Sequence, residues 1–328
     1  MLAPSIGGLQ QTTNYKVVLP FYVYAAISFF IGTILLLLNT DIINVHYFNP
    51  HTLAITHVMA LGWGTMIVLG ASHQLLPVLV EGKLDSNLLA YLSFIFTAIG
   101  IPILLVGFYT FQLGSSTQFG GILINIGVIC YLVNVLASSL KSNRRNVHAW
   151  YMITAVLWLF SAVFFGLLLL INFSKPILSK DSVHYLALHA HLGIIGWFLL
   201  MVIGVGTRLI PMFLISKYTN DNILWIIYGL INTGLISFVF MLIYQTSAVY
   251  FYLPIFLIMT AIILFGRHCY LAYKVRIRKN VDEQMKTSLL SVAQMILPIV
   301  TLILLLAILP VDIFPNMAIL YGFCIFFG

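Results

Sequence analysis

Charged residues are scarce in this chain. They make up 7% of its 328 residues, whereas a soluble domain usually carries about a quarter. This shortage excludes an ordinary soluble domain. Apolar runs recur along the whole chain, and the segments between them are too short for a separate soluble domain. The composition therefore predicts an all-α, polytopic transmembrane protein that forms a single membrane domain over residues 1–328.

Cysteine and acidic residues are also few. The three cysteines, Cys130, Cys269 and Cys324, lie far apart in or beside apolar runs, which excludes a disulfide framework and a cysteine-based metal site. The chain has 15 Lys and Arg against 8 Asp and Glu. Most of the basic residues flank alternate loops, so the charge indicates membrane topology rather than binding of nucleic acid. We expect the N-terminus to lie in the cytoplasm.

The apolar runs predict the transmembrane spans. Nine spans are expected at about 17–39, 52–80, 87–111, 119–140, 150–172, 184–215, 223–244, 249–273 and 288–309. The first is longer than a signal-peptide core, so we expect it to be retained. A tenth begins near Met317 and stops at Gly328, which is too short to cross a bilayer. We expect the polypeptide to continue, with about 12 spans in the complete protein.

A repeat is visible within these spans. Placing His57 in register with His191 aligns five identities of spans two and six. The aligned pairs are His57 with His191, Gly62-Trp63 with Gly196-Trp197, Gly70 with Gly204, and Pro77 with Pro211. We therefore predict parallel four-helix repeats at about 17–140 and about 150–273, with an incomplete third repeat at about 288–328.

Two histidines lie inside the duplicated spans. His57 and His191 are deep enough that a polar side chain needs a partner, either an iron or copper ion or a structural hydrogen bond. His184 shares a helix face with His191, since they lie close to a whole number of turns apart, whereas His189 points elsewhere. His184 is close to the interface, where simple solvation is the alternative.

Haem fits this pattern better than zinc. A closed zinc site takes four ligands, often cysteines, and no cysteine is near these histidines. Haem needs only one or two axial imidazoles and an apolar slot. Gly62 and Gly196 would let either a neighbouring helix or a flat cofactor approach closely.

The predicted site follows from these features. We predict haem b, with copper as a further possible metal. The cofactor-binding residues are His57, His191, His189, Gly62 and Gly196, and the metal-ligand candidates are His57, His191, His189 and His184. No catalytic residue is identified.

The motif H-x4-G-W-x6-G-x6-P and the histidine-bearing spans resemble a known group of proteins. The chain resembles subunit I of haem–copper oxidases and is similar to NnrS-type and short oxidase-subunit-I-like membrane proteins of bacteria. The resemblance implies that His57 binds a low-spin haem and that His191 or His189 binds copper. The chain departs from the oxidases because span seven contains no histidine and span ten is cut short. From the resemblance we expect a bacterial inner-membrane protein. Oxidoreductase activity stays open, but full oxygen reduction is not expected from these residues.

The expected function is electron transfer or chemistry of a diatomic gas at the haem. The first alternative is a non-catalytic accessory protein that stores haem or copper or passes it to a partner. A transporter is less favoured, because the polar groups lie at the outer end of the spans. Expected partners are the lipid bilayer and cytochrome or respiratory-complex subunits.

Overall fold

The computed structural model describes residues 13–44, 46–142, 146–244, 247–308 and 314–327. These residues form helices and no extended strand. Within this part of the chain, nine helices are long and apolar enough to cross a membrane. The prediction of an all-α polytopic helical bundle is confirmed, and the chain is a membrane protein.

The helices follow one another with short connections. In chain order they are α1 (Tyr15–Leu38), α2 (Pro50–His57), α3 (Met66–Leu79), α4 (Asn87–Tyr109), α5 (Ser115–Leu140), α6 (Val147–Ser174), α7 (Leu186–His191), α8 (Leu200–Phe213), α9 (Asp221–Ile243), α10 (Tyr252–Lys274), α11 (Glu283–Gln294), α12 (Leu297–Ile308) and α13 (Phe314–Phe327). Each of the nine predicted spans overlaps one of the nine membrane-length helices in the described residues. For spans two and six these are the continuous stretches Pro50–Leu79 and Val183–Phe213, which include α2 with α3 and α7 with α8. The ninth span differs in detail, because it begins at Glu283 and is divided into α11 and α12.

Spans two and six contain π-helical segments that the sequence pattern does not reveal. The segment Val58–Thr65 (η2) joins α2 to α3, and Leu192–Leu199 (η4) joins α7 to α8. The two segments coincide when His57 is placed in register with His191, as in the sequence repeat. π-Helical turns are rare, and where they occur they are often found at functional sites. Each begins at the residue after a predicted ligand, His57 or His191.

The chain divides into two compact units. Among the described residues, unit 1 lies within Met1–Ile42, Phe48–Ala149 and Phe160–Tyr185, and unit 2 lies within Ile43–Tyr47, Trp150–Leu159 and Leu186–Gly328. Helix α6 contributes to both units, so this division does not follow the predicted repeat boundary between residues 140 and 150. The four-helix repeats stay a prediction.

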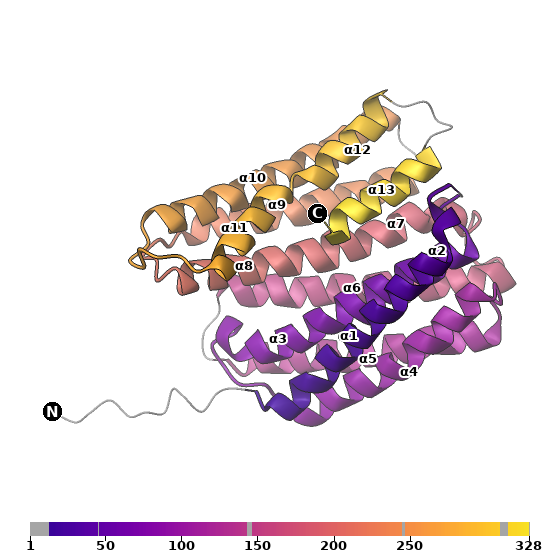
Figure 1. Ribbon diagram of the computed structural model, residues 1–328, viewed down its shortest axis with the longest axis horizontal. Coiled ribbons are helices and arrows are strands. Elements are labelled where there is room, and N and C mark those ends of the chain that lie inside the picture. Colours follow the sequence, from indigo (N-terminus) through magenta and orange to yellow (C-terminus); the bar gives the residue numbers. More distant parts are fainter. Residues whose placement is uncertain (1–12, 45, 143–145, 245–246, 309–313, 328) are drawn as a thin grey trace. The chain divides into compact units, whose positions relative to one another are not determined.

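In unit 1, glycines bring α4 and α5 into backbone contact, and the two helices lie side by side (Figure 1). A Cβ atom built on Gly100 would lie 2.7 Å from the carbonyl oxygen of Gly120. A Cβ atom on Gly120 would lie 2.8 Å from the backbone nitrogen of Leu104. Gly107 and Gly127 also face the partner helix, with Thr117 and Thr97 respectively as neighbours. This is the close packing by small residues that membrane helices use in place of hydrophobic association.

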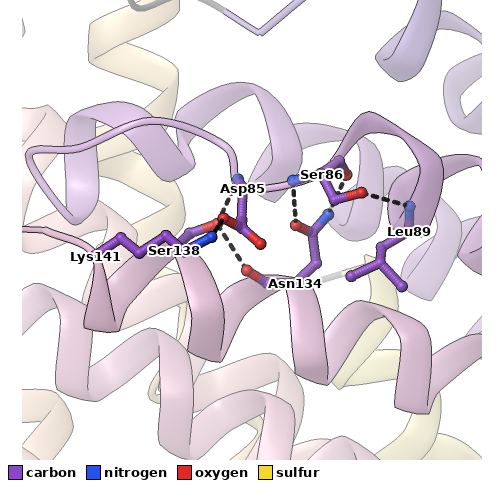
Figure 2. Close-up of polar contacts among 6 residues, drawn as sticks. All are labelled: Asp85, Ser86, Leu89, Asn134, Ser138 and Lys141. Carbon is purple, nitrogen blue, oxygen red and sulfur yellow. Dashed lines mark hydrogen bonds and ion pairs between the residues drawn. The ribbon is translucent and has the colours of Figure 1, made fainter.

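Polar side chains of α5 hold the start of α4 (Figure 2). Asn134 accepts a hydrogen bond from the Ser86 backbone nitrogen at 3.0 Å and donates one to the Ser86 carbonyl oxygen at 2.9 Å. The Ser138 hydroxyl accepts from the Asp85 backbone nitrogen at 2.9 Å. Ser86 in turn caps α4 by accepting from the Leu89 backbone nitrogen at 3.2 Å. These contacts give hydrogen-bond partners to backbone N–H groups at the start of α4, which have no partner within the helix.

We expect Asn134→Ala to destabilise unit 1 by about 2–3 kcal/mol, because its buried side chain satisfies two backbone groups of Ser86. The matched control is Lys141→Ala. Lys141 pairs with Asp85, but its side chain is 72% exposed, so its removal should change stability by less than about 1 kcal/mol. The melting temperatures of the purified variants in detergent measure the difference. Equal losses of melting temperature in the two variants would contradict a stabilising role for the hydrogen bonds between Asn134 and Ser86.

The helices α3 and α8 end in the same way. Glu81 and Ile215 both adopt a left-handed backbone conformation, with φ of 53° and 50°. Just beyond them, the Gly82 nitrogen donates to the Pro77 carbonyl at 3.1 Å and the Ser216 nitrogen donates to the Pro211 carbonyl at 2.9 Å. Both ends therefore have the hydrogen bond of a Schellman cap, and this geometry again recurs in the register of the sequence repeat.

Candidate functional site

In unit 1, His57 is the last residue of α2 and is partly buried. Its Nδ1 atom lies 2.7 Å from the carbonyl oxygen of Leu53, one turn earlier. A carbonyl oxygen can only accept, so Nδ1 carries the proton and donates it, and Nε2 carries the lone pair. The ring lies 4.6 Å from the ring of Phe108, which belongs to α4, with an interplanar angle of 46°.

In unit 2, His191 has the same environment. Its Nδ1 atom donates to the carbonyl oxygen of Ala187 at 2.7 Å, so its Nε2 atom also carries the lone pair. The ring lies 4.8 Å from that of Phe238 in α9, again at 46°. The duplication therefore extends from the sequence to the tautomer and to the π-helical segment that follows. Each imidazole also has a phenylalanine neighbour, but Phe108 and Phe238 are not equivalent positions of the repeat.

Hydrogen bonding of Nδ1 to a carbonyl oxygen is how proteins orient an imidazole whose other nitrogen binds a metal. The bond alone does not identify a ligand. His73, buried in α3, donates from Nδ1 to the Leu69 carbonyl at 2.7 Å and stacks on Phe21 at 5.2 Å. Among the described residues directly after His73, the chain stays α-helical to the end of α3 at Leu79. The adjoining π-helical segment is therefore what sets His57 and His191 apart.

The other predicted ligands lie in different surroundings. His184 is exposed, and its backbone nitrogen donates to the Asp181 carboxylate at 2.9 Å. It belongs to unit 1, whereas His189 and His191 both belong to unit 2. His189 is partly buried in α7. Among the described residues, no three or more His, Cys, Asp or Glu side chains form a group that could hold a metal ion. Ligation by these histidines stays a prediction.

The two predicted cofactor-contacting glycines face neighbouring helices. A Cβ atom on Gly62 would lie 2.8 Å from the Cβ and Oγ atoms of Ser28 in α1. A Cβ atom on Gly196 would lie 2.6 Å from the side chain of Trp158 in α6. In the structure both glycines permit close helix packing, the first of the two alternatives. Their contact with a cofactor stays a prediction.

The sequence-based prediction missed three aromatic residues at these histidines. Phe108 and Phe238 lie in α4 and α9, one residue and five residues before the C-terminal end of their helix. The third, Tyr321 in α13, places its hydroxyl oxygen 3.4 Å from Nε2 of His191. The two rings are 5.9 Å apart and nearly parallel, at 24°. The chain has 24 Phe and 17 Tyr, and no sequence signal separates these three residues from the rest.

The chain was compared with models of known protein families and with curated proteins, and neither comparison found a match.

Proposed function

We propose that this protein is a haem-binding protein of the bacterial inner membrane, related to subunit I of haem–copper oxidases, with its N-terminus in the cytoplasm. The Nε2 atoms of His57 and His191 would hold b-type haem. The observation that carries the proposal is the duplicated histidine geometry: the same fixed tautomer and a π-helical segment beginning at the next residue, with a phenylalanine ring beside each imidazole. The basic residues on alternate loops support the orientation.

The donor atoms suit haem. Haem brings most of the ligands of its iron with it, so a single imidazole could hold it without a neighbouring group of protein ligands. When bound, the haem iron supplies reversible electron transfer or binding of a diatomic gas. The carbonyl groups of Leu53 and Ala187 would hold each imidazole in the ligating tautomer and raise its basicity. Phe108 and Phe238 would give each ring an apolar neighbour and help to exclude water.

A second candidate is a non-catalytic protein that stores haem or copper or passes it to a respiratory partner. Helix α9, the seventh span, contains no histidine, and span seven supplies copper ligands in the oxidases that the chain resembles. This favours a role without oxygen reduction. A haem that transfers to apomyoglobin within minutes and supports no turnover would favour the second candidate over a resident electron carrier.

Optical spectra of the purified protein in detergent test the proposal. We expect the parent protein to show a haem Soret band, and His57→Ala and His191→Ala each to lose a large part of it. His73→Ala is the matched control, because His73 has the same Nδ1 bond but no π-helical segment after it. The control should keep the full band. A parent protein that binds no haem, or two ligand variants with the parent spectrum, would refute the proposal.

A further inference from the structure

Tyr321 reaches His191 from a distant part of the chain. It belongs to α13, which packs against α12 within unit 2. The Thr301 hydroxyl of α12 lies 3.7 Å from the Cys324 sulfur of α13, as its hydrogen-bond donor. One turn before Cys324, the hydroxyl oxygen of Tyr321 lies 3.4 Å from Nε2 of His191. The predicted third repeat therefore contributes a polar group to the histidine of the second.

The Tyr321 hydroxyl is the hydrogen-bond donor in its contact with His191. Nδ1 of His191 already donates its proton to the Ala187 carbonyl, so Nε2 can only accept and the Tyr321 hydroxyl is the donor. A neutral imidazole has a single in-plane lone pair on this nitrogen, and a metal ion would use the same lone pair. The hydroxyl and a metal ion would therefore draw on the same lone pair.

We propose that Tyr321 is a cap on Nε2 of His191 and weakens metal ligation there. The inference rests on the proposed function for its ligand, haem iron. The distance of 3.4 Å is long for a hydrogen bond, so the cap is weak and haem can displace it. The stacked tyrosine ring would keep the hydroxyl close to the site after displacement. Tyr321 is thus a positioning residue that sets how readily His191 accepts its ligand.

Haemin titration measures the competition. In a His57→Ala background, Tyr321→Phe keeps the ring stacked on His191 and removes only the hydroxyl. We expect haemin to bind about two- to threefold more tightly, the effect of losing one hydrogen bond at the weak end of the usual range from the unbound state. The matched control is Tyr321→Phe in a His191→Ala background, where haemin affinity should not change. Unchanged or weaker binding in the His57→Ala background would overturn the cap.

A second measurement needs no haem. Diethylpyrocarbonate acylates the imidazole nitrogen that carries the lone pair, and mass spectrometry reports the rate at each histidine. Tyr321→Phe should raise the rate at His191 several-fold and leave the rate at His57, the internal reference for folding, unchanged. An unchanged rate at His191 would overturn the cap. If the rate rises but neither single-histidine background binds haemin, the proposed function fails and the cap stands.

Discussion

Replacing Gly120 by alanine is expected to destabilise unit 1 by about 3 kcal/mol or more, the upper part of the range for overpacking. The new Cβ atom would lie 2.8 Å from the Leu104 nitrogen and 2.9 Å from the Gly100 carbonyl oxygen. Both are backbone atoms, so no side-chain rotation can relieve the contact and α4 must move away from α5. Such a shift weakens the van der Waals contact along the whole helix pair.

The control for this substitution is Gly266→Ala in α10. A Cβ atom there would meet no heavy atom within 4 Å, and alanine is the better helix former. We expect Gly120→Ala to lower the melting temperature of the detergent-purified protein by about 5–10 °C, and Gly266→Ala to leave it unchanged or raise it slightly. Similar melting temperatures for both variants would show that backbone contact between α4 and α5 does not limit stability.

Asn172→Ala should release the loop after α6 and raise its rate of tryptic cleavage at least about tenfold. The Asn172 amide makes four hydrogen bonds with this loop. Its oxygen accepts from the Ile177 nitrogen at 2.9 Å and the Leu178 nitrogen at 2.8 Å, and its nitrogen donates to the Lys180 carbonyl and the Ser182 hydroxyl, both at 3.1 Å. Every donor and acceptor of this buried side chain is used.

The loop offers trypsin one site, Lys180, because Pro176 follows Lys175 and prevents cleavage there. Because cleavage requires the backbone to leave its folded position, its rate reports how often the loop opens. Ser179→Ala is the matched control, since the Ser179 hydroxyl contacts only the Tyr185 hydroxyl, at 2.9 Å, among its described hydrogen bonds. Cleavage at Lys83, outside the loop, provides the reference within each sample. A rate for Asn172→Ala equal to that of Ser179→Ala would contradict the proposed role of Asn172.

The spans could be predicted from the sequence because bilayer thickness imposes a minimum length on any apolar helix. The matching surroundings of His57 and His191 were also predictable, since the repeat aligns both with the same neighbours along the chain. The π-helical segments were not, because an apolar run around Gly62 and Gly196 has no polar face from which to read a helical period.

Contacts between distant helices were the other part that could not be predicted. The chain has 23 glycines. Nothing in their spacing alone distinguishes Gly120, where a Cβ atom would meet the backbone of α4, from Gly266, where a Cβ atom would meet no heavy atom within 4 Å. Likewise, Tyr321 lies far from His191 along the chain, yet the two side chains meet. Such a pairing depends on how α13 packs within unit 2, and a local pattern contains no information about it.

At the left-handed ends of α3 and α8, the backbone conformation is the same although the residues differ. A β-branched residue is strongly disfavoured in this backbone conformation, yet Ile215 adopts it where the equivalent position holds Glu81. The conformation is therefore imposed by the flanking hydrogen bonds and not chosen by the residue that adopts it. Two copies of an element can therefore differ in nearly all their side chains and still turn at the same point. In such proteins, common ancestry is better sought in the backbone conformation than in the amino-acid sequence.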